Sequence, residues 1–247
     1  VDMQSNNTFT NGFTICSNGF VKVGSGNIFE GGTAVMMPDL ADLVMPTSGF
    51  DSNDGLENAL YAGGYKPLIL YRLEELILSF MNGTYNSLPY TDPKTYLVSM
   101  TPVVLSGAGA VTELDLLPGY IYMKTCTGGV PLQLKLSSPT EVISEIVLVT
   151  NCRITMPAKV KLEDAVIATL NSSPNSISTA ADFQIGRDDD CADGGGAQVL
   201  AMGGISIGAQ LYMFGGQMIA WGDIDFAAEA DGIQGASMIS GGDVNGT

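Results

Sequence analysis

The chain has 247 residues, of which 45% are apolar, so it is long enough to bury a sizeable core. Ten basic residues against 26 acidic ones give a formal net charge of −16, which repels phosphate backbones and anionic lipid surfaces. Nucleic-acid binding is therefore excluded as an expected function. With 31 Gly and only 15% charged residues, the composition favours strands and tight turns over a helical bundle.

A short apolar phrase recurs near both ends of the chain. Leu200, Ile219 and Ile239 begin equivalent phrases at intervals of 19 and 20 residues, and residues 7–9 (Asn-Thr-Phe) return as residues 27–29 (Asn-Ile-Phe). One coil of this length cannot bury its own apolar face, so neighbouring coils must stack. The repeat predicts a mainly β fold, a right-handed parallel β-helix with 19–20 residues per coil. The handedness follows the usual preference of β crossover connections.

The repeat divides the chain into three parts within one structural domain. Residues 1–37 are predicted to form the N-terminal coils, residues 38–139 an inserted α-containing segment packed on the solenoid, and residues 140–247 the C-terminal coils. Asn7 and Asn27 are expected to stack as a structural side-chain ladder. Both chain ends interrupt the repeat. We therefore expect a piece of a longer product, whose open coil edges at the chain ends would let copies stack.

Two helices are predicted inside the inserted segment. Asp54 is placed to cap a short helix over residues 56–61, and Pro67 stands in the first turn of a longer one. The apolar positions 69, 73, 76, 77 and 80 share one face of the longer helix, which Asn82-Gly83 ends. This face is expected to pack on the flank of the solenoid or to plug its end; a partner-binding helix is the alternative.

Five tyrosines follow this helix among Pro and Ser residues. They are Tyr85, Tyr90, Tyr96, Tyr120 and Tyr122. We expect half-buried structural supports, and a protein contact is the alternative.

The four cysteines are most simply explained by disulfide bonds. None lies in a C-x-x-C pair and the chain has no His, which argues against a zinc site and against a Cys-His catalytic pair. We expect Cys152 to pair with Cys191 and Cys16 with Cys126, out of three connectivities that four cysteines allow. Such bonds would place the protein outside the cytoplasm; buried reduced thiols in an intracellular protein are the alternative.

An acidic loop is the first candidate ligand site. Asp188, Asp189, Asp190 and Asp193 offer the oxygen ligands that calcium prefers, in a Gly-flanked loop. Their spacing matches neither an EF-hand loop nor the glycine-rich nonapeptide calcium repeat. A calcium site is one hypothesis and a solvated turn held by Cys191 is the other. No other cofactor is indicated.

An acid pair is the second candidate site. Asp223 and Asp225 lie two residues apart on one strand face, about 7 Å from each other. Glycosidase carboxylate pairs use separations in this range, and parallel β-helices often carry polysaccharide-cleaving enzymes. The chain has only three Arg and no His, whereas a site for acidic sugars would need more positive charge. Working phosphate-loop and nucleophile-elbow motifs are absent. We therefore expect no catalytic residues and a protein that is not an enzyme.

Several long phrases carry a resemblance to a known family. NCRITMPAKVKLEDAVIATLNSS, IGRDDDCADGGG and QMIAWGDIDFAAEADGIQGASMISGGDVNGT resemble the C-terminal region of TadG-like proteins of the Tad/Flp (tight adherence) pilus of alphaproteobacteria. NNTFTNGFTICSNGFVKV and MPDLADLVMPTSGFDSNDGLENAL are similar to the preceding part of these proteins. Two family features are missing here: the N-terminal membrane helix, and the DxSxS metal-ion adhesion motif of some relatives.

The resemblance implies an extracytoplasmic protein of the cell envelope that takes part in pilus assembly or attachment. Its expected function is that of a non-enzymatic scaffold, whose partners are other envelope or pilus proteins or copies of itself. A secreted, self-stacking surface-filament subunit or adhesin is the alternative, and a carbohydrate-active enzyme comes third. No run approaches the roughly 18 apolar residues of a membrane span, so membrane contact is expected only through the missing N-terminal anchor.

Overall fold

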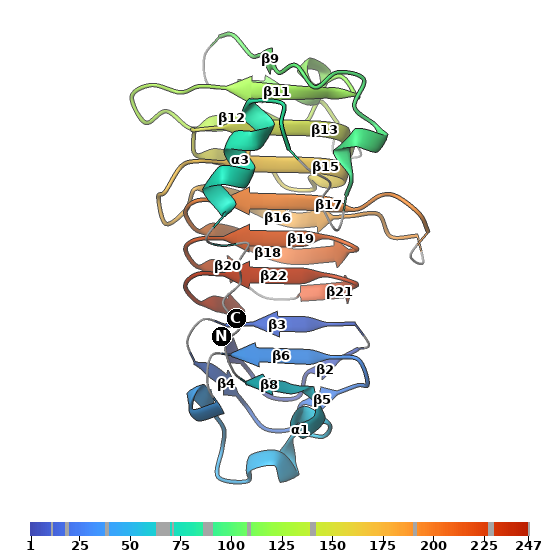
Figure 1. Ribbon diagram of the computed structural model, residues 1–247, viewed down its shortest axis with the longest axis vertical. Coiled ribbons are helices and arrows are strands. Elements are labelled where there is room, and N and C mark those ends of the chain that lie inside the picture. The colour runs from blue at the N-terminus through green and yellow to red at the C-terminus, as the bar shows by residue number, and fades with distance from the viewer. Residues whose placement is uncertain are drawn as a thin grey trace.

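A computed structural model describes residues 1–10, 12–17, 20–37, 40–62, 70, 72–85, 91–107, 110–138, 142–189, 192–226 and 230–246. Its described strands stack into one elongated solenoid (Figure 1). In this part of the chain, 21 strands belong to a single sheet whose neighbouring strands run parallel. The mainly β, parallel β-helix predicted from the repeat is therefore confirmed.

One wall of the solenoid, which we call the first wall, runs the full length of the stack. From one end to the other it contains β9 (Val103–Val104), β11 (Tyr120–Lys124), β13 (Val142–Thr150), β15 (Lys161–Thr169), β17 (Ala197–Ala201), β19 (Gln217–Ala220), β22 (Ser237–Ser240), β3 (Thr14–Cys16), β6 (Ala34–Met37) and β8 (Leu60–Ala62). Successive side chains point to opposite faces of a strand. In β13, Leu148 accordingly packs inside the coil and Val149 packs on the outer face.

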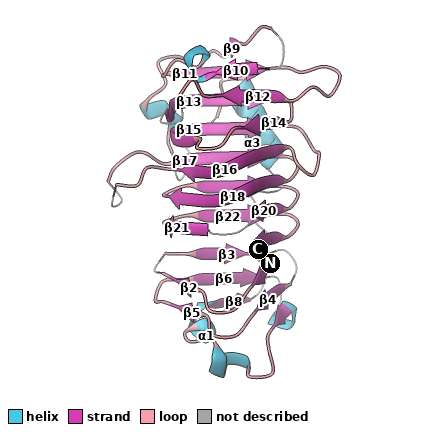
Figure 2. Ribbon diagram, turned by 180° about the vertical axis from the view of Figure 1, so that it is seen from behind, coloured by secondary structure: helices cyan, strands magenta, loops and turns pink. Residues whose placement is uncertain are grey.

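A second wall faces the first and is seen from behind in Figure 2. It contains β10 (Ala110–Thr112), β12 (Leu132–Lys135), β14 (Ile154–Met156), β16 (Ile177–Ile185), β18 (Ile205–Phe214), β20 (Ile224–Phe226), β23 (Val244–Gly246), β1 (Asp2–Met3), β4 (Val21–Val23) and β7 (Leu43–Val44). Ile154, Ile177 and Ile205 are register partners on three successive coils and are fully buried. Such columns bury the apolar face of each coil against the next.

A shorter third face joins the two walls. It is formed by the ends of β16 and β18, the starts of β13 and β15, and β21 (Ala230–Gln234). In the N-terminal coils, β2 (Thr8–Phe9) and β5 (Ile28–Phe29) pair in the corresponding place. Lys159, Asp182 and Gln210 follow one another in register at one corner, with φ of 66°, 58° and 52°. Non-glycine residues rarely adopt this left-handed backbone, so the aligned corner is a conformation that the coil stack imposes.

The beginning and the end of the chain meet in the middle of the solenoid, and we call this junction the seam. β22 pairs with β3 through three residue pairs that begin with Ser237 and Thr14, and β23 pairs with β1 through Asn245 and Asp2. Figure 1 shows the two termini side by side at this level. Two interior cores lie on either side of the seam, and Val244 packs against both of them. The last coil of the chain is thus continued by its first.

The seam corrects two expectations about the chain ends. The C-terminal phrases were expected as the far end of the solenoid, separated from the coils of residues 1–37 by the inserted segment; instead the two sets of coils stack directly on each other. The chain ends also do not present open coil edges in the described structure, because these edges pair with each other. End-to-end stacking of copies through the chain ends therefore loses its structural basis.

The middle boundaries also need correction. Residues 38–139 were expected as an insertion, but they supply the solenoid strands β7 to β12 as well. The solenoid resumes at β9, well before residue 140, because β9 pairs with β11 and β11 in turn pairs with β13. Both pairings join neighbouring strands of the first wall. The segment that leaves the solenoid, between β8 and β9, is therefore much shorter than expected.

The end of the solenoid at β7 and β8 is closed by short helices. These are η1 (Leu40–Asp42), η2 (Gly49–Ser52) and α1 (Leu56–Ala59). Leu56 and Ala59 of α1 are buried in the interior core of the N-terminal coils. The predicted short helix exists, but its N-cap is Gly55 and not Asp54, whose backbone bridges to Ile28. Gly55 has a φ of 76°, and a Cβ there would lie 2.1 Å from the carbonyl oxygen of Phe29. Only glycine fits this close approach.

The longer helix, α3 (Leu73–Met81), lies across the outer face of the first wall (Figure 1). Leu73, Ile77 and Phe80 are buried against β11, β13 and β17, while Leu76 is only half-buried. Asn82 is the C-cap, and Gly83 follows in the left-handed conformation, as predicted. The expected start of the helix at residues 67–69 lies outside the described residues. The apolar face therefore packs on the flank of its own solenoid.

Candidate functional site

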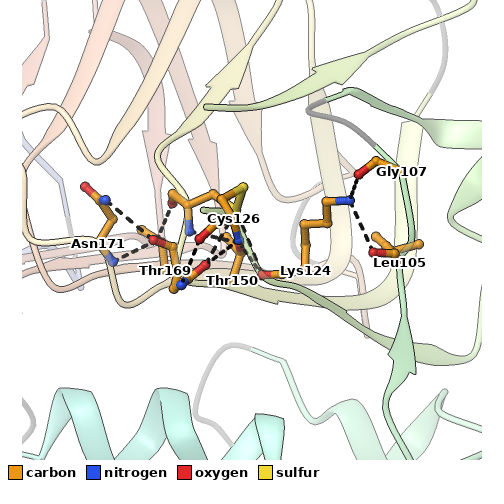
Figure 3. The surroundings of a disulfide bond; sticks show 9 residues. Leu105, Gly107, Lys124, Cys126, Thr150, Thr169 and Asn171 are labelled. Atoms are coloured by element: carbon orange, nitrogen blue, oxygen red, sulfur yellow. Dashed lines mark hydrogen bonds between the residues drawn. A yellow bond between two sulfur atoms is a disulfide. The ribbon is translucent and has the colours of Figure 1, made fainter. Parts of the chain in front are cut away.

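The clearest chemical feature is a disulfide bond between two neighbouring coils (Figure 3). Cys126 and Cys152 follow the paired strands β11 and β13, and their Cα atoms lie 5.3 Å from each other. The expected pairings of Cys152 with Cys191 and of Cys16 with Cys126 are therefore wrong. The physical reason is that Cys126 and Cys152 hold equivalent places on adjacent coils. Cys191 and the side chain of Cys16 lie outside the described residues.

Buried threonines fix the corner that carries this bond (Figure 3). Thr150 Oγ1 donates a hydrogen bond of 2.6 Å to the carbonyl oxygen of Lys124, and Thr169 Oγ1 donates one of 2.6 Å to that of Cys152. Both threonines are fully buried, and the backbone N–H of Asn171 donates to Thr169 Oγ1 at 3.0 Å. Each hydroxyl links one coil to the next, so the corner is held rigidly by hydrogen bonds as well as by the disulfide.

The described part of the acidic loop is held by an arginine. The Nε atom of Arg187 donates to the carboxylate of Asp189, and its Nη2 atom donates to the carbonyl oxygen of Asp193 at 3.2 Å. The hydrogen bond to Asp189 raises the pKa of Arg187 above its ordinary value. Asp189 also accepts a 3.2 Å hydrogen bond from the backbone N–H of Ala192. This carboxylate therefore has protein partners on both of its oxygens.

The rest of the acidic loop gives the calcium hypothesis no support. Asp190 and Cys191 lie outside the described residues, and the described ones contain no group of three or more acidic, Cys or His side chains arranged to hold a metal ion. Nearby, Asp164 Oδ1 accepts a 2.9 Å hydrogen bond from the backbone N–H of Gly195, which ties the base of the loop to β15. Burial raises the pKa of Glu163 on the same strand.

The acid pair at β20 is used to join coils. Asp223 Oδ1 accepts a 2.9 Å hydrogen bond from the backbone N–H of Asp243, and Asp225 Oδ1 accepts one of 2.9 Å from Nδ2 of Asn245. Both partners lie on the next coil, at or beside β23. The two carboxylates therefore connect β20 to the coil of β23.

Amide side chains, most of them buried, form two ladders along the stack. Asn27 Oδ1 accepts from the backbone N–H of Asn7 at 2.9 Å, and Asn53 Oδ1 accepts from Nδ2 of Asn27 at 3.2 Å. The expected stacking of Asn7 on Asn27 is confirmed, and the sequence missed the third member because it lies outside the regular period. Gln198 and Gln217 form a second buried pair, between β17 and β19.

The tyrosines after α3 mostly serve the core. Tyr85 is 3% exposed and its ring lies 4.7 Å from that of Phe80, centroid to centroid. Burial raises the pKa of Tyr85 to about 12. The Tyr122 hydroxyl donates a 3.1 Å hydrogen bond to the carbonyl oxygen of Leu117, and Tyr96 and Tyr120 are half-buried. These four residues act as supports, and Tyr90 lies outside the described residues.

Fold and side-chain chemistry together define a class: a disulfide-linked parallel β-helix whose conspicuous polar side chains connect its coils. In the described residues, no helix is long and apolar enough to cross a membrane. The whole chain, residues 1–247, matches the family described as Domain of unknown function (DUF7867), and the chain belongs to this family. A search of curated proteins finds no match. A search of solved structures also finds none.

Proposed function

We propose that this protein is a non-enzymatic structural component of a bacterial cell envelope, outside the cytoplasm, where its solenoid acts as a rigid scaffold for other envelope or pilus proteins. The observation that carries this proposal is the use of the acidic side chains. Asp164, Asp223 and Asp225 each accept a hydrogen bond from another coil or from the loop beside it. Carboxylates held in this way connect neighbouring parts of the stack and stiffen it, which suits a structural role.

Two further observations support the location. The disulfide of Cys126 and Cys152 suits an oxidising compartment, because cytosolic proteins rarely keep such bonds. The resemblance of the C-terminal phrases to TadG-like proteins favours the cell envelope and a role in pilus assembly or attachment. A stiff, disulfide-linked stack is a suitable support for partners in such an assembly.

Thiol trapping in the native host tests the location. Cells are quenched in acid, free thiols are alkylated, and the cysteine peptides are mapped without reduction. We expect Cys126 and Cys152 to be joined in intact cells. Alkylated, reduced forms of both cysteines would contradict an extracytoplasmic location, since the geometry of the bond is already in place in the folded protein.

Complementation tests the scaffold role. Deletion of the gene should impair pilus assembly or surface attachment, and a chain carrying both Asp223→Asn and Asp225→Asn should restore it. Asn keeps the side-chain oxygen that accepts each hydrogen bond but cannot act as a catalytic acid. As a control, both chains are shown to have the same melting temperature. A folded double variant that fails to restore attachment would favour an enzyme instead.

A further inference from the structure

One end of the solenoid, formed by β9, β10 and the loop with η4 (Glu113–Asp115), has an unusually apolar surface. Among the described residues, the four most exposed large apolar side chains all belong to residues 98–117: Leu114 (73%), Val98 (72%), Val104 (65%) and Leu117 (61%). Figure 1 places β9 at this extremity of the stack. Concentrated apolar exposure of this kind marks an interaction surface more often than chance exposure does.

The charge distribution favours this end over the rest of the surface for contact with a second copy of the chain. Residues 91–138 carry three acidic and three basic side chains, so this end has no net charge in a chain of net charge −16. Residues 40–62, at the opposite end, carry four acidic side chains and no basic one. A second copy of this strongly acidic chain is repelled from most of the surface, and least from the β9 end. The opposite end is also closed by the helix α1.

The backbone of β9 offers the pairing groups. β9 pairs with β11 on one side, where the N–H of Leu105 donates to the carbonyl oxygen of Met123 at 2.9 Å. In a parallel pair, alternate residues of a strand direct both their N–H and C=O groups to the neighbour. Val103 and Leu105 therefore face β11, and the N–H and C=O of Val104 point away from it. Neither residue of β9 is charged or proline, so β9 itself carries no side chain that opposes pairing at Val104, while Pro102 just before it limits such pairing to this short strand.

We propose that two copies of this chain associate head to head through the β9 end, with Val104 of one copy opposite Val104 of the other across a two-fold axis. In an antiparallel pair, two opposite residues can exchange both N–H···O=C hydrogen bonds, and Val104 directs both groups outward for this. A closed, two-fold contact uses the same patch on both copies. The exposed Val98, Leu114 and Leu117 then become covered around the paired strands.

This inference rests on the proposed scaffold role in one respect: it names a second copy of the chain as a partner of that scaffold. Its test measures mass and cross-linking, whereas the scaffold role is tested by compartment and complementation. Either proposal can therefore fail while the other stands.

The first test is the mass of the purified chain over a dilution series, by sedimentation equilibrium. We expect a species of twice the 25.8 kDa chain mass at high concentration. Val104→Pro should shift the protein to the monomer, because proline removes the outward N–H without removing a hydrogen bond to β11. An unchanged circular dichroism spectrum and melting temperature would show that this variant is folded. A monomer at every concentration, a dimer that survives Val104→Pro, or open-ended filaments would each overturn the proposal.

Cross-linking tests the two-fold geometry directly. Opposite residues of a hydrogen-bonded antiparallel pair have Cα atoms about 5.5 Å apart, which suits a disulfide. Val104→Cys should therefore give a covalent dimer on oxidation. Phe20→Cys is the matched control, since Phe20 is 48% exposed but lies in the N-terminal coils near the seam. Equal cross-linking of the two variants would refute head-to-head pairing.

Discussion

The cross-coil disulfide leads to a quantitative prediction. Replacing both Cys126 and Cys152 by Ser removes a link between cysteines at a sequence separation of 26. In the chain-entropy account, closing a loop of this length reduces the entropy of the unfolded chain by roughly 12 cal/mol/K. At 25 °C this corresponds to about 3.5 kcal/mol of stability. For a chain of this size, the midpoint of thermal unfolding should fall by about 7–14 °C.

Urea unfolding of the wild type and the double variant, each with and without reductant, measures this effect. The variant should unfold at lower urea concentration, reductant should reproduce the loss in the wild type, and it should leave the variant unchanged. Cys191→Ser is a further control, because peptide mapping should still find Cys126 joined to Cys152. A double variant as stable as the wild type, or a map that joins Cys126 to Cys16, would refute the reasoning.

Three other predictions concern single side chains. Asn27→Ala should lower the free energy of unfolding by about 3 kcal/mol in urea titrations, because buried partners lose their hydrogen bonds, and Asn7→Ala at the exposed end of the ladder should cost less. Phe80→Ala should cost about 3–5 kcal/mol and speed amide exchange in the first wall, whereas Leu78→Ala on the exposed side of α3 should change stability by no more than about 0.5 kcal/mol. Burial raises the folded-state pKa of Glu163, so the wild type should lose stability as pH rises from the ordinary Glu pKa through the raised one. Glu163→Gln should remove that loss, as a pH series of thermal melts of both proteins would show. If wild type and variant depended on pH in the same way, the carboxyl would be fully hydrated and the reasoning wrong.

Periodicity predicted the coils that follow one another without interruption. Leu200, Ile219 and Ile239, which the repeat placed at equivalent positions, are register partners on β17, β19 and β22. The apolar face of α3 was predicted for the same reason, since its spacing is local to one helix. The prediction that Asp54 caps the short helix was wrong because the backbone of Asp54 pairs with Ile28 on another coil, and the sequence around Asp54 does not reveal this pairing.

Coils that carry inserted loops were missed, because a fixed period cannot find them. A signal was nevertheless present: residues 120–126 (YIYMKTC) and residues 146–152 (IVLVTNC) are two apolar runs that both end in Cys. Aligning them gives the observed register of β11 on β13 and the observed disulfide. The seam could not be found in this way, since a repeat fixes the spacing of coils along the sequence and not their order in space.

The seam also determines when folding can be completed. Thr14 and Ser237 pair although they lie close to opposite ends of the chain, so this contact is among the most non-local that the chain can make. During synthesis, the coil of β3 emerges with one strand edge uncovered, and that edge is covered only after the chain has been made as far as β22. Long-range parallel pairing is slow, and uncovered strand edges promote aggregation until they are paired. The time between synthesis of β3 and of β22 is therefore the period in which this protein most depends on staying apart from other copies of itself.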